Sequence, residues 1–229
     1  MNAADTLNTA PPTGPQRQRN PRGQGHRLRG EIIAGAAQLI ERTGSEHSIT
    51  LRAVAREIGI AAPSIAPHFA DRAEIIDAVV ASELEGVSNA LREAATGVAD
   101  PVEALFAAFR AYVAFGWDHP NRYRVIYERR YLEIWDDAQP PMLETGPLMN
   151  RTIELGVSLL QACIDAGRSA STDAFADILA IWMLLHGLVT LPSSITSLPW
   201  PDTDRTLTES VTLLARIQPA PRRRTKARG

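Results

Sequence analysis

Residue types that can act as catalysts are present in this chain, but their spacing assembles neither a catalytic nor a metal-binding set. Cys163 has no histidine near it in the sequence. The sequence contains no phosphate-binding glycine loop, no nucleophile elbow and no HExxH zinc motif. The histidines lack the spacing of metal ligands, and they are His26, His47, His68, His119 and His186. We therefore expect neither an enzyme nor a bound metal or cofactor.

Basic side chains that could bind a polyanion are concentrated towards the two ends. Residues 1–80 hold nine arginines against eight acidic residues, residues 81–218 hold ten against eighteen, and residues 219–229 hold five basic residues and no acid. This division predicts that the front of the chain, rather than the acidic body, meets a polyanion. Simple solvation of arginine-rich tails is the alternative. The arginines leading into the first predicted helix are Arg17, Arg19, Arg22, Arg27 and Arg29.

The overall composition is that of an ordinary globular protein, with 45% hydrophobic and 22% charged residues. The longest apolar stretch, residues 178–191, is interrupted by His186 and Gly187, and we expect it to be too short to span a bilayer. The polar first 25 residues lack the apolar run of a secretory signal. A single cysteine excludes an internal disulfide and fits a reducing compartment. The sequence thus predicts a cytoplasmic location.

The hydrophobic periodicity predicts an all-α fold of about nine helices. We expect a disordered arginine-containing arm over residues 1–25 and a basic disordered tail over 219–229, with one helical domain over 26–80 and a second over 81–218. The expected helices cover residues 26–43, 50–59, 62–68, 71–95, 100–119, 121–131, 148–166, 173–189 and 202–217.

Residues 50–69 have the pattern of a helix-turn-helix, the arrangement that places a second helix in the major groove of DNA. Thr50 is suited to cap the first short helix, and Gly59 supplies the turn. Ala62, Pro63 and Ser64 would face outward and are small enough to approach base edges closely. The residues expected to face the core are Leu51, Val54, Ala55, Ile58, Ile60, Ile65 and Phe69.

The run "ITLRAVAREIGIAAPSIAPHFADRAEII" resembles the N-terminal signature of the TetR (tetracycline repressor) family. The resemblance implies groove and backbone contacts for Thr50, Arg52, Ala62, Pro63 and Ser64, and phosphate contacts for His68 and Arg72. These roles are chemically reasonable, because a guanidinium can bind guanine through two hydrogen bonds and a helix start favours an anion. The matching positions are Thr50, Ala55, Gly59, Ile60, Ile65, His68, Phe69 and Arg72.

Two positions depart from the family pattern. Ala66 stands where the family usually has a tyrosine that reaches a phosphate. Pro67 follows, and a proline inside a helix removes a hydrogen-bond donor, so we expect it to truncate the second helix. DNA affinity is therefore expected to depend more on Arg52, His68, Arg72 and the arginine-rich arm.

In the second half, "HPNRYRVIYERR" and "IWMLLHGLVTL" resemble a C-terminal domain type named for Trp, His and Gly, here Trp182, His186 and Gly187. Aromatic residues are frequent in this half and could line a pocket for a small, largely apolar effector. A histidine on an apolar helix is also common as a hydrogen-bonded core residue, and Gly187 suggests close approach of another helix. The candidate effector residues are Phe109, Trp117, Tyr123, Tyr127, Trp182 and His186.

Taken with the resemblance, these features predict a ligand-responsive transcriptional regulator that associates with the nucleoid. We expect a homodimeric repressor that leaves a palindromic operator when an effector bound over 81–218 shifts the helix over 71–95. The resemblance implies dimerisation through the last two helices, although their apolar stripes also fit packing within one chain. The alternative function is a helical protein-interaction scaffold that has lost specific DNA binding.

Overall fold

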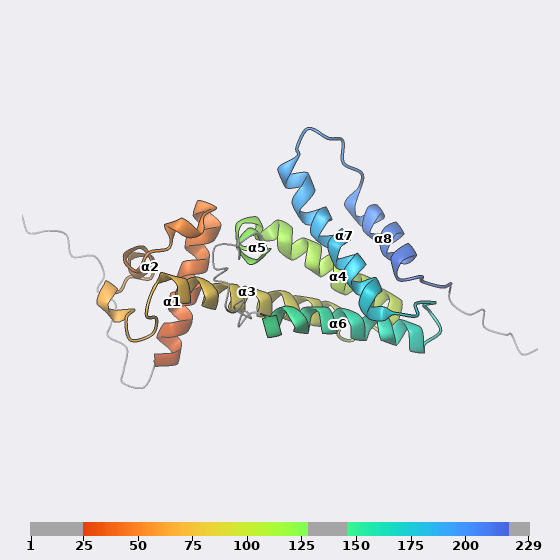
Figure 1. Ribbon diagram of the computed structural model, residues 1–229, viewed down its shortest axis with the longest axis horizontal. Helices are drawn as coiled ribbons and strands as arrows, with labels where there is room; N and C mark the ends of the chain where they lie inside the picture. Colours follow the sequence, from red (N-terminus) through yellow and green to blue (C-terminus); the bar gives the residue numbers. More distant parts are fainter. Residues whose placement is uncertain (1–24, 128–145, 220–229) are drawn as a thin grey trace, which may run out of the picture.

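The computed structural model describes residues 25–127 and 146–219 (Figure 1). Within these ranges the regular structure is helical apart from one isolated bridge between Ser169 and Ile217, so the predicted all-α class is confirmed. Two short 3₁₀ helices, η1 (Glu46–Ser48) and η2 (Ala62–Ser64), accompany the α-helices. These are α1 (Gly25–Thr43), α2 (Leu51–Glu57), α3 (Arg72–Ala95), α4 (Pro101–Asp118), α5 (Pro120–Tyr127), α6 (Gly146–Asp165), α7 (Ala174–Ser194) and α8 (Thr203–Leu214).

Side-chain caps fix where several helices begin. Thr50 caps α2 by accepting a hydrogen bond from the Ala53 amide at 3.0 Å. Asp71 caps α3 by accepting one from the Glu74 amide at 2.9 Å, and the Glu74 carboxylate accepts one from the Ala70 amide at 2.7 Å. These bonds satisfy amides that have no partner within the helix. The helix starts expected at Thr50 and Asp71 therefore have a direct structural cause.

Two hydrophobic clusters organise the described residues. The first joins α1, α2 and the start of α3 around Ile40, Ile65 and Phe69. The second joins the end of α3 to α4, α6, α7 and α8 around Leu105 and Tyr112. Helix α3 contributes to both clusters and runs the length of the molecule from α1 towards α6 (Figure 1). The domain boundary expected at residue 80 lies within this continuous helix and remains a proposal.

Several predicted boundaries differ from those observed. Helix α7 was expected to end at Val189 but continues through Pro192 to Ser194, although Pro192 cannot donate to the Leu188 carbonyl. Helix α6 begins earlier than expected, at Gly146. Residues 128–131 of the helix expected over 121–131 lie outside the described ranges. Nearly all of the expected arm and tail lie outside them as well.

Helix α7 is long and apolar enough to cross a membrane by length and composition alone, the one such helix among the residues that the structure describes. The apolar stretch of residues 178–191 lies within this helix, which extends over 21 residues. Only 22% of its apolar window is buried inside the molecule. Much of the apolar surface of α7 is thus left uncovered by this chain.

Candidate nucleic-acid interface and effector site

The turn after α2 has the geometry that a helix-turn-helix requires. Gly59 adopts a φ of 70°, a left-handed conformation that glycine accommodates without strain. The Ile60 amide then donates to the carbonyl of Ala55 at 2.9 Å and closes the end of α2. Val54 and Phe69 are at most 1% exposed, so both sides of the turn are anchored in the first cluster. The residues expected to face the core are all buried or half-buried.

The segment after the turn is not an α-helix. Residues 62–64 form the 3₁₀ helix η2, and a turn continues to His68, whose amide donates to Ile65 O at 2.8 Å. The predicted helix over 62–68 was therefore wrong in type. Pro63 and Pro67 both lack an N–H, so Pro67 cannot make the α-helical bond to the Pro63 carbonyl, and the tighter 3₁₀ turn results.

The residues expected to contact the DNA groove lie on this exposed side of the motif. Thr50, Arg52 and Pro63 are exposed, whereas Ala62 and Ser64 are half-buried. Within the described ranges, no hydrogen bond or ion pair engages the guanidinium of Arg52, which projects from the first turn of α2. The sequence from 58 to 70 contains no acidic residue. This surface is therefore free to meet an anion.

Two arginines of this region make contacts within the chain that the sequence did not predict. Arg72 donates from Nη2 to the carbonyl of Glu46 at 2.8 Å, while its Nε is buried without a hydrogen-bond partner. The Arg29 guanidinium lies 4.6 Å from the centroid of the Phe69 ring, a cation–π contact. Arg29 therefore belongs to the helix-turn-helix surface. His68 is half-buried beside Phe69 in sequence, at the end of the turn.

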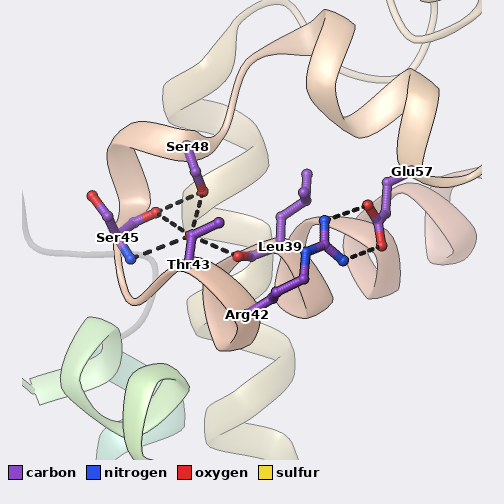
Figure 2. Close-up of polar contacts among 6 residues, drawn as sticks. All are labelled: Leu39, Arg42, Thr43, Ser45, Ser48 and Glu57. Carbon is purple, nitrogen blue, oxygen red and sulfur yellow. Dashed lines mark hydrogen bonds and ion pairs between the residues drawn. The ribbon is translucent and has the colours of Figure 1, made fainter.

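A salt bridge between side chains of α1 and α2 helps to position α2 against α1 (Figure 2). Arg42 donates two parallel hydrogen bonds to the carboxylate of Glu57, at 2.8 and 2.7 Å. The hydrogen bonds raise the pKa of Arg42 and lower that of Glu57. Thr43 donates to the Leu39 carbonyl at 2.7 Å. Sequence reasoning missed the Arg42–Glu57 pair, since the two residues are separated by 15 positions across a turn.

The second candidate site is an aromatic and polar cluster among α4, α5 and α7. The structure brings together four of the predicted effector residues and adds Tyr112, which sequence reasoning did not assign to the site. Trp182 Nε1 donates to Tyr112 Oη at 3.1 Å, Tyr112 Oη lies 2.9 Å from Tyr123 Oη, and Tyr123 Oη lies 2.7 Å from His186 Nδ1. Tyr127 completes the cluster, with its ring centroid 4.6 Å from that of Tyr123. We call Tyr112, Tyr123, Tyr127, Trp182 and His186 the aromatic cluster.

Two of the predicted effector residues lie outside this cluster. Phe109 is 4% exposed within the second hydrophobic cluster. Trp117 is 49% exposed, and no ring contact among the described residues joins it to the aromatic cluster. An adjacent contact explains how α4 and α7 come so close: a Cβ on Gly116 would lie 2.5 Å from Val189 Cγ1. Within this chain the close approach is thus at Gly116, and a close approach of another chain at Gly187 stays a prediction.

The tyrosines of the aromatic cluster supply neutral hydrogen-bonding groups. Burial raises the pKa of Tyr112 and of Tyr127, so both hydroxyls stay protonated at neutral pH. The hydroxyl of Tyr127 is buried and makes no hydrogen bond of ordinary geometry. The members of the cluster include no carboxylate, lysine or arginine. Among the residues that the structure describes, no group of His, Cys, Asp or Glu could hold a metal ion.

Several large apolar side chains on α7, α8 and the segment between them are exposed. The most exposed are Leu213, Met183 and Phe175, at 77, 64 and 58%. Leu198 and Ile195 are 50 and 42% exposed. Apolar patches of this kind on soluble proteins mark interaction surfaces.

An exposed helix-turn-helix joined by one long helix to a helical domain with a buried polar cluster defines the class of helical DNA-binding regulators. Residues 105–214 match the family described as "Tetracyclin repressor-like, C-terminal domain". The match covers just under half of the chain, whose C-terminal part is thus similar to that of tetracycline-repressor-like regulators.

A curated relative is the "HTH-type transcriptional activator FasR" of Mycolicibacterium smegmatis, which is 26% identical over 134 residues. That match covers 56% of this chain and 61% of the relative, so it spans less than two thirds of the relative's length.

Solved structures share the fold. A protein of unknown function from Rhodococcus sp. RHA1 has a TM-score of 0.71 at 24% identity, covering 86% of this chain and 98% of that one. FadR from Bacillus subtilis in complex with stearoyl-CoA has a TM-score of 0.63 at 16% identity, covering 81 and 97%. At these identities the likeness establishes the shared fold.

Proposed function

We propose that this chain is a homodimeric, ligand-responsive transcriptional repressor that binds a palindromic DNA site. The observation that carries the proposal is the exposed, acid-free surface of the helix-turn-helix, on which the Arg52 guanidinium is unengaged by the described residues. Thr50, Arg52, Ala62, Pro63 and Ser64 contact the groove and its edges. His68 and Arg72 contact phosphates, the latter while it also holds η1.

Selection of DNA from a random pool by the purified full chain tests this function. We expect a palindromic site to be enriched, and its affinity to fall steeply with salt, by a log–log slope of about −0.9 for each phosphate neutralised. A scaffold that has lost DNA binding would enrich nothing and would show no salt-dependent retention. The proposal would then be wrong.

The effector proposed for the aromatic cluster is small, largely apolar and neutral. The cluster includes no carboxylate, lysine or arginine that would pair with an ionised effector group, so a neutral effector is favoured. The protonated Tyr127 hydroxyl can donate to a carbonyl or hydroxyl oxygen. FadR, which shares the fold, was solved with stearoyl-CoA, so small uncharged acyl compounds are chosen as the first series. A ligand screen that reports the melting temperature, followed by competition with the selected DNA, tests this assignment.

Homodimerisation is proposed through α7 and α8. A two-fold axis is needed to place two recognition segments about one DNA turn apart, roughly 34 Å. The exposed apolar residues Met183 and Leu213 supply a surface that another copy would bury. This role also explains why α7 exposes apolar side chains in a protein that we propose to be cytoplasmic.

Activation of transcription is a second candidate function beside repression. The curated relative is named a transcriptional activator, so activation by this chain is the alternative to repression. Transcription in vitro from a template carrying the selected site distinguishes the two, because a repressor lowers the transcript and an activator raises it. In both cases we propose that effector binding shifts α3 and changes the separation of the two recognition segments.

A further inference from the structure

Helix α5 lies between the two hydrophobic clusters and belongs to both. Figure 1 shows it between α1 and the part formed by α4 and α7. Ile126, 2% exposed, is part of the first cluster, whereas Tyr123, 1% exposed, is part of the second. One short helix therefore contacts both the core of the helix-turn-helix and the aromatic cluster.

The first turn of α5 is bonded to the last turn of α1. Asn121 donates from Nδ2 to the Glu41 carbonyl at 2.8 Å, and the Arg122 amide donates to the Glu41 carboxylate at 3.3 Å. A carboxylate at a helix N-terminus is favoured by the unpaired amides there. The packing is close, since a Cβ on Gly44 would lie 3.2 Å from Asn121 Oδ1.

The Arg122 side chain adds α3 to this junction. Its Nε lies 3.8 Å from the Glu41 carboxylate and its Nη1 lies 3.6 Å from that of Glu83. These separations are longer than hydrogen bonds, and Arg122 Nε is buried without a hydrogen-bond partner. Burial raises the pKa of Glu83, and the charge of Arg122 opposes that rise. A small movement of α5 would convert these ion pairs into hydrogen bonds or break them.

The sequence neighbours of Arg122 and Glu41 connect this junction to the aromatic cluster on one side and to α2 on the other. Next to Arg122, Tyr123 is hydrogen-bonded to His186 and Tyr112 in the aromatic cluster. Next to Glu41, Arg42 makes the paired hydrogen bonds to Glu57 at the end of α2 (Figure 2). The path from the aromatic cluster to the helix-turn-helix thus passes through two adjacent pairs of residues.

We propose that the junction of Glu41, Asn121, Arg122 and Glu83 transmits changes at Tyr123 to the position of the helix-turn-helix. This inference rests on the proposed function and adds to the shift of α3 a second connection, from α5 to α1. Arg122 and Glu41 are positioning residues, which contact neither DNA nor effector. Coupling needs an element with two arrangements that both sites influence, and in this proposal the second arrangement is one in which the long ion pairs of Arg122 close or break.

A double-mutant cycle tests the proposal without an identified effector. Affinity for the selected DNA is measured for the full chain, Tyr123→Phe, Arg122→Ala and the double variant. We expect Tyr123→Phe to change affinity about threefold or more in the wild-type background, and by less than half that factor in the Arg122→Ala background. In hydrogen exchange, Tyr123→Phe should alter protection of residues 38–45, and Arg122→Ala should remove that response.

Glu41→Gln repeats the cycle with a side chain of the same shape, so that a folding defect of Arg122→Ala does not decide the result. Arg92→Ala is the matched control, because Arg92 is exposed and bonds to Asn89 in its own helix. The coupling would be overturned if Tyr123→Phe changed DNA affinity by the same factor in all backgrounds. It would also be overturned if Tyr123→Phe had no effect on DNA affinity in the wild-type background. A wild-type chain that selects no DNA would overturn the proposed function as well.

Discussion

Arg72 in the first turn of α3 donates a hydrogen bond to the carbonyl oxygen of Glu46 in η1, 26 residues earlier in the chain. The bond joins the start of the long helix to the segment that precedes α2. Arg52, by contrast, is exposed at the start of α2. The two arginines are thus expected to contribute to DNA binding in different ways, one through structure and phosphate contact and the other through the groove.

Replacing Arg52 by alanine should weaken binding to the selected site and relax its base preference. A bidentate contact to a base contributes about 1–3 kcal/mol of discrimination, so we expect a loss of about tenfold. Fluorescence anisotropy with the selected site and with random DNA measures both effects. Equal losses on the two DNAs would contradict a groove contact by Arg52.

Replacing Arg72 by alanine should lower stability as well as affinity. A hydrogen bond from a charged group contributes about 1.5–3 kcal/mol, and we expect the lower part of that range because Arg72 is half-buried. Urea unfolding measures the loss, and anisotropy should show weaker binding to all sequences alike. Arg92→Ala serves as the control and should stay within about 0.5 kcal/mol of the wild type.

Restoring a tyrosine at Ala66 should strengthen DNA binding without changing the preferred sequence. Ala66 is exposed at the turn after η2, so the larger side chain can be accommodated. One additional hydrogen bond to a phosphate is expected to raise affinity by a few-fold on every DNA. Ala66→Phe lacks the hydroxyl and is the control. An equal gain from phenylalanine would show that the phosphate bond is not the cause.

A charge on the exposed apolar surface should prevent dimerisation. Leu213→Glu alters a side chain that is 77% exposed, so the fold of one chain should be unaffected, while a buried unpaired charge would destabilise a dimer interface. Sedimentation should show a monomer, and binding to the palindromic site should fall sharply. Ser82→Glu, an exposed change on α3, should leave the dimer intact. A dimeric Leu213→Glu protein would place the interface elsewhere.

The tyrosines of the aromatic cluster should respond differently to loss of the hydroxyl. Tyr112→Phe leaves the Trp182 donor without an acceptor and should cost about 1–3 kcal/mol. Tyr127→Phe removes a buried hydroxyl that makes no hydrogen bond of ordinary geometry, so it should cost less stability than Tyr112→Phe. Unfolding in urea distinguishes them. If Tyr127→Phe also leaves effector affinity unchanged, Tyr127 is not the proposed donor.

Local sequence signals were sufficient for much of this structure. The caps at Thr50 and Asp71 and the turn at Gly59 act on amides only a few residues away, and helical periodicity decides which side chains face the core. The sequence therefore determined the helix-turn-helix scaffold, the all-α class and the arrangement of apolar faces. It also anticipated truncation of the second helix by Pro67, although not the 3₁₀ geometry that two prolines impose.

Tertiary structure alone decided the contacts between residues far apart in the chain. The pairing of Arg42 with Glu57, the position of Arg72 on Glu46 and the meeting of Tyr112 with Trp182 all depend on how helices cross. The side-chain pattern of one helix specifies which face is buried but not which partner residue it meets. For that reason the sequence identified the aromatic residues, whereas only packing showed that Tyr112 joins them and that Trp117 does not.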